Sequence, residues 1–268
     1  MVLFPNCKIN IGLNVIRKRA DGYHDLETVF YPVALKDAIE VIRSSEFNFQ
    51  LSGLPVIGTA DNNLCVKAYN HLKQDFPALP PVSIHLHKTI PMGAGLGGGS
   101  ADGAFMLKLL NKKFQLNLSE KKLISYALEL GSDCPFFIIN KPCFATGRGE
   151  NLSPVQLDLS GYKLVLVNPG IHVSTKEAFS KLSPAIPAKS IGKIIQQPIE
   201  SWKDELKNDF EETVFQLYPA IQNIKEELYA KGAIYASMTG SGSTVYGIFK
   251  TESRFDFSFP AGYNCLIV

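Results

Sequence analysis

Hydrophobic and polar residues alternate along much of the first part of the chain. Ile9, Ile11, Leu13 and Val15 are separated by polar residues or glycine, which is the period-two pattern of a β-strand. Similar apolar runs predict further strands over residues 26–33, 38–42, 82–86, 162–167, 234–238 and 244–249. The last two runs are joined by a short segment of Gly, Ser and Thr, which predicts a hairpin.

Other segments repeat their apolar residues every three or four positions, which is the helical period. They predict helices over residues 64–76, 101–113, 119–131, 174–182, 203–217 and 220–231. Because strands and helices are mixed rather than regularly alternating, the pattern indicates an α+β fold. Polar residues, Pro and Gly interrupt the pattern near residues 151–161. We therefore expect two domains, residues 1–155 and 156–268.

Composition excludes several classes of protein. The 268 residues include 27 Lys and Arg against 25 Asp and Glu, a balance too even to predict a nucleic acid or a membrane surface as partner. Five scattered cysteines without a Cys-x-x-Cys pair argue against a disulfide framework or a structural zinc site. Neither a signal peptide nor a membrane-length apolar run is visible. We expect a cytoplasmic protein that is a monomer or a weak homodimer.

The most informative segment is a glycine-rich run between a predicted strand and a predicted helix. Residues 91–100 read Pro-Met-Gly-Ala-Gly-Leu-Gly-Gly-Gly-Ser. Glycines expose backbone N–H groups in a tight turn, and the following helix adds its unpaired N–H donors and the positive end of its dipole. Such a loop suits phosphate, although a flexible turn without a ligand has the same composition. We interpret Ser100 as the N-cap of the helix.

Three known classes of glycine loop differ from this run. A dinucleotide loop shares the spacing of its glycines, but it needs a strand that ends in an acidic residue about 20 residues further on. Lys112-Lys113 occupies that region here. The run ends in Gly-Gly-Ser, without the Lys of a P-loop, and the motifs of protein kinases are absent. The sequence therefore indicates a phosphate loop of another kind.

Three segments together resemble the signatures of the GHMP small-molecule kinases. Residues 4–14, 91–100 and 238–246 occur in the order found in that family and span nearly the whole chain. Residues 19–28 and 130–137 are similar to the branch that phosphorylates the 2-hydroxyl of a cytidine-diphosphate derivative of methylerythritol, in the non-mevalonate isoprenoid route. The resemblance implies an N-terminal domain like domain 2 of ribosomal protein S5 and a ferredoxin-like C-terminal domain, with ATP and substrate between them.

The resemblance also implies which residues hold ATP with Mg²⁺. The glycine loop would wrap the phosphates, two residues would lie near the adenosine, and a second glycine-rich segment would close the far side. These residues are Asn63, Lys88, Pro91, Gly93, Gly95, Leu96, Gly97, Gly98, Gly99, Ser100, Gly240, Ser241 and Gly242. No residue is assigned as a metal ligand. Some members have a second serine after the loop where this chain has Ala101, so a role for that hydroxyl does not transfer.

By the same resemblance, Asp133 is the candidate base for the acceptor hydroxyl, and Lys8 is the cation that stabilises the developing alkoxide. Taken alone, Asp133 is also typical of a helix N-cap and Lys8 of a solvated strand edge. Asn10, two residues after Lys8, lies on the same side of a strand and would orient the substrate, or is an ordinary polar edge residue. In the first turn of the helix, Asp102 either faces the nucleotide or its metal ion, or lies in solvent and complements the helix dipole.

For the substrate, the resemblance implies that Tyr23 and Phe179 sandwich a cytosine ring and that His24 contacts its polar edge. Aromatic faces suit a nucleobase because they stack on it. Taken alone, Tyr23 is equally typical of a turn and Phe179 of a helix core. The implied partner is a small molecule that carries a cytidine diphosphate group.

Two alternatives to this substrate remain open. One is another GHMP kinase, of the homoserine or mevalonate type. The segment Asp21-Gly22-Tyr23-His24 weighs against it, because those acceptors carry no nucleobase. The other is a non-catalytic nucleotide-binding module on the same fold. The presence of both Lys8 and Asp133 weighs against it, because a module that only binds needs no proton acceptor.

Overall fold

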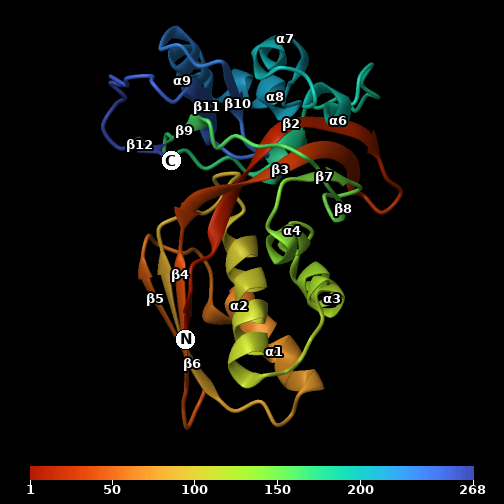
Figure 1. Cartoon of the computed structure of the whole chain (residues 1–268), viewed down its shortest axis with the longest axis vertical. Helices are drawn as coiled ribbons and strands as arrows, with labels where there is room; N and C mark the ends of the chain where they lie inside the picture. Colours follow the sequence, from red (N-terminus) through yellow and green to blue (C-terminus); the bar gives the residue numbers. More distant parts are fainter. The chain divides into compact units, whose positions relative to one another are not determined.

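A computed structural model describes residues 1–268 and confirms the α+β class, with three four-stranded sheets and helices mixed among them (Figure 1). Contacts divide the chain into two compact units. The first comprises Met1–Lys8, Pro32–Met92 and Gly97–Lys141, and the second comprises Ile9–Tyr31, Gly93–Leu96 and Pro142–Val268. The boundary expected after residue 155 stays a prediction.

The first unit is built on a sheet in the order β1-β4-β6-β5. Its strands are β1 (Val2–Leu3), β4 (Ala38–Arg43), β5 (Asn48–Gly53) and β6 (Val82–Lys88). Because β5 and β6 are parallel, they need a crossover, which contains η1 (Ala60–Asn62) and α1 (Leu64–Asp75). The unit also contains α2 (Gly98–Phe114), α3 (Glu120–Leu130) and α4 (Cys134–Ile139). Burial alternates along β6, and Figure 1 shows the helices of this unit on one side of the sheet.

Two sheets include strands of the second unit. One has the order β2-β3-β7-β8 and the other β10-β11-β9-β12. Their strands are β2 (Asn6–Lys18), β3 (His24–Lys36), β7 (Cys143–Thr146), β8 (Asn151–Pro154), β9 (Tyr162–Asn168), β10 (Tyr235–Met238), β11 (Val245–Lys250) and β12 (Asn264–Ile267). Strands β2 and β3 contribute residues to both units. The predicted hairpin is confirmed, because β10 and β11 pair antiparallel with Met238 opposite Val245.

The two longest helices of the second unit bury apolar faces against the second of these sheets. The helices of this unit are α5 (Thr175–Phe179), α6 (Ile191–Ile194), η2 (Ile199–Ser201), α7 (Trp202–Glu205), α8 (Phe210–Leu217) and α9 (Pro219–Ala230). Along α9, Ile221, Ile224 and Leu228 are buried and join a core cluster with residues of β9, β10 and β11. Pro219 occupies the first turn of α9, where the missing N–H of proline has no cost.

The continuous helix predicted over residues 203–217 is wrong, because an irregular stretch separates α7 from α8. In that stretch, the side-chain amide of Asn208 donates hydrogen bonds to the carbonyls of Met238 at 2.8 Å and Gly240 at 2.9 Å. Asn208 also forms a β-bridge with Leu13. Long-range hydrogen bonds thus replace the local helical ones, although the apolar spacing continues.

Other predicted elements differ in extent. The helix expected over residues 174–182 is limited to α5, which begins after the capping box of Ser174 and Glu177. Both faces of β2 are buried from Asn6 to Leu13, although its alternating sequence is typical of a strand with one solvated face. Strands β5, β7, β8 and β12 and helix α4 were not predicted. Strands β7, β8 and β12 and helix α4 are short, whereas the alternation of Phe49 and Leu51 with polar residues along β5 is a signal that the prediction missed.

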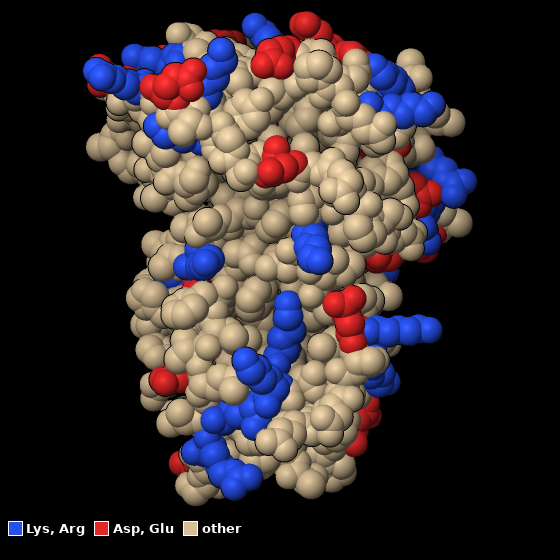
Figure 2. All heavy atoms as spheres, viewed as in Figure 1, with Lys and Arg blue, Asp and Glu red and all other residues tan.

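Charged side chains of both signs lie on the face seen in Figure 2, most of which is formed by uncharged residues. Lys and Arg gather in one run over the helices of the first unit. No helix is both long and apolar enough to cross a membrane. Cysteines 7, 65, 134 and 143 are buried, whereas Cys265 on β12 is exposed, and all five are free thiols.

Candidate active site

The first unit brings the candidate base and the candidate cation together. Lys8, near the start of β2, is 3% exposed, and its Nζ atom lies 3.7 Å from Oδ2 of Asp133. The side chain of Asp133 remains 34% exposed. The arrangement is therefore a buried ammonium group beside a carboxylate that solvent, and so a substrate hydroxyl, can reach.

Asp133 does not cap the helix that follows it. It occupies the N-cap position of α4, but its side chain makes no capping hydrogen bond. Pro135 lies in the first turn. The N–H groups of this turn have no partner within the helix, so the missing N–H of proline costs nothing. The carboxylate is therefore available to Lys8 and to a ligand, which is the geometry that a proton acceptor needs.

The environment of Lys8 opposes its positive charge. Burial lowers the pKa of Lys8, while the charge of Asp133 acts in the opposite direction. The interpretation of Lys8 as a solvated edge residue is wrong, because its side chain is buried and so are its neighbours on both faces of β2. A Cβ atom built on Gly97 would lie 3.2 Å from Cε of Lys8, so the glycine loop passes directly over the lysine side chain.

Helix α2 begins earlier than its sequence suggested. Its N-cap is Gly97, which has the left-handed conformation with φ of 70°. Ser100 therefore lies inside the first turn, and its interpretation as the N-cap is wrong. The N–H group of Ala101 is the first to bond back, to the Gly97 carbonyl at 2.9 Å. The N–H groups of the three residues before it are the unpaired donors of a helix start, which favour an anion.

A link between this first turn and the candidate base was not predicted. The side chain of Ser100 lies close enough to the thiol of Cys134, the residue after Asp133, to lower the pKa of that thiol. Burial is the larger effect and raises the pKa of that thiol to about 12, so it is neutral. The first turn of α2 therefore lies near the start of α4, and the sequence contains no signal for this proximity.

Three other residues near the predicted nucleotide site have defined structural partners. Asn63 is the N-cap of α1, and its side chain accepts a hydrogen bond from the Cys65 N–H at 2.9 Å. Lys88 is 3% exposed and forms ion pairs with Asp37 and Asp102. The expectation of a solvated Asp102 is wrong, because it is 2% exposed. A contact of Asn63 or Lys88 with adenosine stays a prediction.

In the second unit, two glycine-rich segments pack backbone against backbone. A Cβ atom built on Gly95 would lie 1.9 Å from the Thr239 carbonyl oxygen, and one on Gly242 would lie 2.2 Å from the Gly95 nitrogen. Gly95 also has a φ of 78°, which L-residues rarely adopt. Residues 93–96 and 239–242 thus fit together only with glycine at these positions. Their contacts with ATP, like those of Pro91, Leu96, Gly240 and Ser241, stay predictions.

Asn10 lies at the centre of a buried hydrogen-bond network. It is 3% exposed, and its side-chain amide donates to the Thr28 hydroxyl at 3.0 Å. The hydroxyl of Thr239 donates to Oδ1 of Asn10 at 3.3 Å and accepts its backbone N–H at 3.0 Å. These bonds hold β2 to the second glycine segment, and a role of Asn10 in orienting the substrate stays a prediction.

The three predicted substrate residues all lie in the second unit. Two of them stack on each other, and the third contacts an arginine. The rings of His24 and Phe179 are stacked with centroids 4.5 Å apart, so the two rings face each other directly. Burial and, secondly, the charge of Lys18 lower the pKa of His24. Tyr23 is 56% exposed, and the guanidinium of Arg148 lies 4.9 Å from its ring centroid. A cytosine sandwich between Tyr23 and Phe179 stays a prediction.

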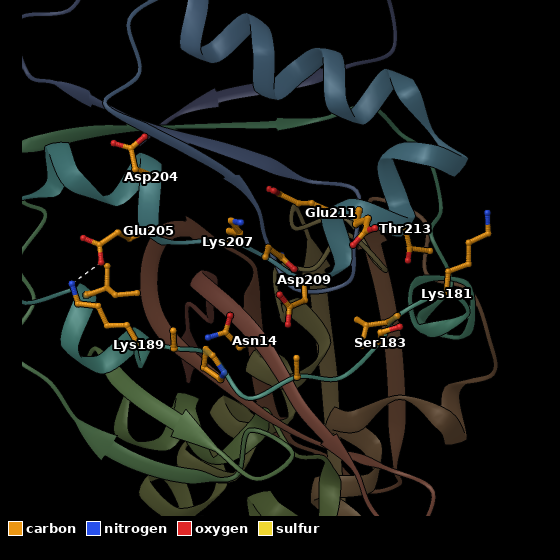
Figure 3. Close-up of a pocket in the computed structure, with 17 residues that line it drawn as sticks. Asn14, Lys181, Ser183, Lys189, Asp204, Glu205, Lys207, Asp209, Glu211 and Thr213 are labelled. Carbon is orange, nitrogen blue, oxygen red and sulfur yellow. Dashed lines mark hydrogen bonds and ion pairs between the residues drawn. The ribbon is translucent and has the colours of Figure 1, made fainter.

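A cavity of about 810 Å³ in the second unit lies elsewhere (Figure 3). None of the predicted site residues lines it; its wall includes Asn14, the segment of Lys181 to Lys189 and residues of α7 and α8. Two of its charged groups pair with each other: Glu205 and Lys189 lie 2.6 Å apart, as the dashed line in Figure 3 marks. Asp209 accepts the N–H of Val15 at 2.7 Å. Several charged groups of the wall therefore have partners within the protein.

Comparison with known proteins defines the class first. The family model described as "GHMP kinases N terminal domain" matches residues 63–141, and "GHMP kinases C terminal" matches residues 187–257. A solved homoserine kinase from Cytophaga hutchinsonii shares the fold with a TM-score of 0.68 at 16% identity, over 92% of this chain and 85% of that one. Fold and sequence together define a GHMP kinase, an ATP-dependent kinase of small molecules.

Relatives with higher sequence identity identify a particular family within the GHMP kinases. A 4-diphosphocytidyl-2-C-methyl-D-erythritol kinase of Bacteroides fragilis is 57% identical, over 95% of this chain and 94% of its own length. A crystal structure of 4-(cytidine 5'-diphospho)-2C-methyl-D-erythritol kinase has a TM-score of 0.80 at 30% identity, over 92% of this chain and 90% of that one. The chain belongs to the family of 4-diphosphocytidyl-2-C-methyl-D-erythritol kinases, and the resemblance expected from its motifs is confirmed.

Proposed function

We propose that this chain transfers the γ-phosphoryl group of ATP to the 2-hydroxyl of 4-diphosphocytidyl-2-C-methyl-D-erythritol, in the non-mevalonate route to isoprenoid precursors. The observation that carries the proposal is the 57% identity to a relative of that name over 95% of the chain. Homoserine kinase shares the fold at only 16% identity, so the fold alone does not select the acceptor.

Asp133 and Lys8 divide the chemistry of the acceptor hydroxyl. Phosphoryl transfer requires positioning and charge stabilisation more than covalent help from the protein. Asp133 accepts the hydroxyl proton while the oxygen forms its bond to the γ-phosphorus. The bond from that phosphorus to the bridging oxygen breaks, and ADP leaves with the electron pair. Lys8, held 3.7 Å from Asp133, stabilises the negative charge that develops on the attacking oxygen.

The first turn of α2 is the proposed site of the nucleotide phosphates, because its unpaired N–H groups and helix dipole favour an anion. No group of three or more His, Cys, Asp or Glu lies together in a way that would hold a metal ion. Mg²⁺ needs few protein ligands of this kind, because it usually keeps several waters and is bound largely through substrate phosphates. When bound, Mg²⁺ neutralises charge on the phosphates.

The second unit supplies the proposed recognition of cytosine through Tyr23, His24 and Phe179. Replacing Tyr23 or Phe179 with Ala removes a stacking face worth about 1–3 kcal/mol per base. We expect KM for the cytidylyl substrate to rise by about 5- to 150-fold while KM for ATP stays the same. Phe47→Ala, which removes a ring that is 40% exposed in the first unit, is the matched control. An equal rise in KM for ATP would contradict the assignment.

The decisive experiment offers the purified protein four acceptors with ATP and Mg²⁺: the cytidylyl-methylerythritol, homoserine, mevalonate and galactose. Formation of ADP is followed together with the phosphorylated product. We expect turnover of the cytidylyl compound alone. Faster turnover of another acceptor would favour a different GHMP kinase activity, and binding of ATP without turnover of any acceptor would favour a nucleotide-binding module.

A further inference from the structure

A buried cluster of three charged side chains lies under the first turn of α2. Lys88, at the end of β6, directs its Nζ atom to the Oδ2 atoms of Asp37 and of Asp102, the latter at 2.7 Å. All three side chains are at most 3% exposed. A Cβ atom built on Gly98 would lie 3.4 Å from this Nζ atom. The ammonium group therefore lies directly below the residue at which the helix begins.

The two carboxylates of the cluster are not equivalent. Oδ1 of Asp37 accepts the backbone N–H groups of Thr89 at 2.6 Å and Ile90 at 2.8 Å, and its other oxygen accepts Lys88. Oδ1 of Asp102 is buried without any hydrogen-bond partner. Hydrogen bonds from several donors favour the ionised form of a carboxylate, whereas burial without donors favours the neutral form. Asp102 is therefore the member of the cluster that is ready to accept a proton.

The charges around Asp102 support this distinction. Burial raises the pKa of Asp102 to about 7, Lys88 opposes the rise and Asp37 adds to it. Burial alone would lower the pKa of Lys88, but the two carboxylates raise it, so the ammonium group keeps its charge. Cys65 on α1 also faces the cluster, and burial raises the pKa of its thiol well above the usual value. The cluster thus carries a net charge of −1 with both carboxylates ionised.

That negative charge opposes an anion at the helix start. The unpaired N–H groups of the first turn attract phosphate, while an ionised Asp102 in a medium of low dielectric repels it. We propose that nucleotide binding to this chain is coupled to the uptake of one proton by Asp102, a positioning residue that sets the charge below the phosphate site. The proton comes from the buffer and forms an O–H bond at Oδ1 of Asp102. The inference rests on the proposed function, since it assumes that the phosphates lie at this helix start.

The test is calorimetric titration of the whole protein with ATP and Mg²⁺, without acceptor, in buffers of different ionisation enthalpy. The dependence of the binding heat on the buffer reports the protons taken up. We expect the wild-type protein to take up about half a proton more than Asp102→Asn at pH 7, and close to one more at pH 8, because less of Asp102 is protonated before binding. The comparison removes any proton that ATP itself gains or loses. Glu46→Gln, an exposed carboxylate of the same unit, is the matched control and should equal the wild type.

A second measurement needs no variant. Above pH 7.5 the phosphates of ATP have largely completed their own ionisation, so Kd for ATP in the wild type should rise towards tenfold per pH unit. Measurable binding with a flat profile, or with equal proton counts in the wild type and Asp102→Asn, would overturn the inference and leave the proposed function intact. Failure of the wild-type protein to bind ATP at all would overturn both.

Discussion

Two lysines of the first unit are buried to the same extent, yet their surroundings give them opposite properties. Lys8 and Lys88 are each 3% exposed. Lys8 has a carboxylate at 3.7 Å whose side chain is 34% exposed, and burial lowers its pKa. Lys88 contacts two carboxylates that are both sealed from solvent; burial acts on it too, but the two carboxylates raise its pKa.

The difference lies in whether the partner carboxylate can be reached. Asp133 is open to solvent and makes no capping bond, so a substrate hydroxyl has access to it. Asp37 and Asp102 have no such opening, and their cluster holds β6 to α2. In the proposed mechanism, the same pair of residue types serves proton transfer in one place and positioning in the other.

The largest effect should come from Asp133→Asn, which keeps the shape of the side chain and removes its basicity. We expect kcat to fall by about 10²- to 10⁴-fold, the scale of lost acid–base catalysis, with Kd for ATP nearly unchanged. Steady-state kinetics and calorimetric titration with ATP measure the two quantities. Glu46→Gln is the control for loss of a carboxylate charge. An unchanged kcat would remove Asp133 from the mechanism.

Replacing each of the two lysines with methionine should lower the free energy of unfolding by different amounts. Lys88→Met leaves two buried carboxylates without a counter-ion, and breaking a buried ion pair in this way costs about 3–5 kcal/mol of unfolding free energy. Lys8→Met leaves only a carboxylate that water reaches, so we expect a loss of about 1 kcal/mol or less. Urea unfolding followed by circular dichroism measures both. Equal losses would mean that the exposure of Asp133 makes no energetic difference.

The smallest expected effect is on how the free energy of unfolding depends on pH. The pKa of Asp102 is raised to about 7 in the folded protein and is about 3.9 in an unfolded chain. Between these values the native state holds a proton that the unfolded state has lost. The contribution of Asp102 to the free energy of unfolding is therefore lost as pH rises towards 7. We expect Asp102→Asn to gain stability relative to the wild type between pH 4.5 and 7.5, as urea midpoints will measure. Parallel curves would contradict the shifted pKa.

Sequence patterns predicted the parts of this fold that depend on local physics. The alternation around Ile9 and the helical spacing of residues 64–76 describe elements that the structure confirms. The break at Asn208 was missed because its partners, the carbonyls of Met238 and Gly240, lie about 30 residues away in the chain. No local pattern reports such a bond.

In the candidate site, too, local motifs were predicted and contacts between distant residues were not. Lys8 and Asp133 were found through their motifs, and the structure places them side by side. Asp37 was missed, and of the two alternatives left open for Asp102 the solvated one is wrong, because a single carboxylate beside an apolar run does not reveal whether a lysine covers it. The proximity of Ser100 to Cys134 likewise depends on the packing of two helix starts that are distant in sequence.

The backbone-to-backbone packing of Gly95 against residues 239–242 also bears on inhibitor design. At Gly95 and Gly242 any added side-chain atom would collide with main-chain atoms, so the protein has few viable substitutions there. A compound that binds mainly through the N–H and C=O groups of these segments would leave little room for resistance mutations. Compounds that depend on the exposed Tyr23 ring could lose affinity through many more substitutions.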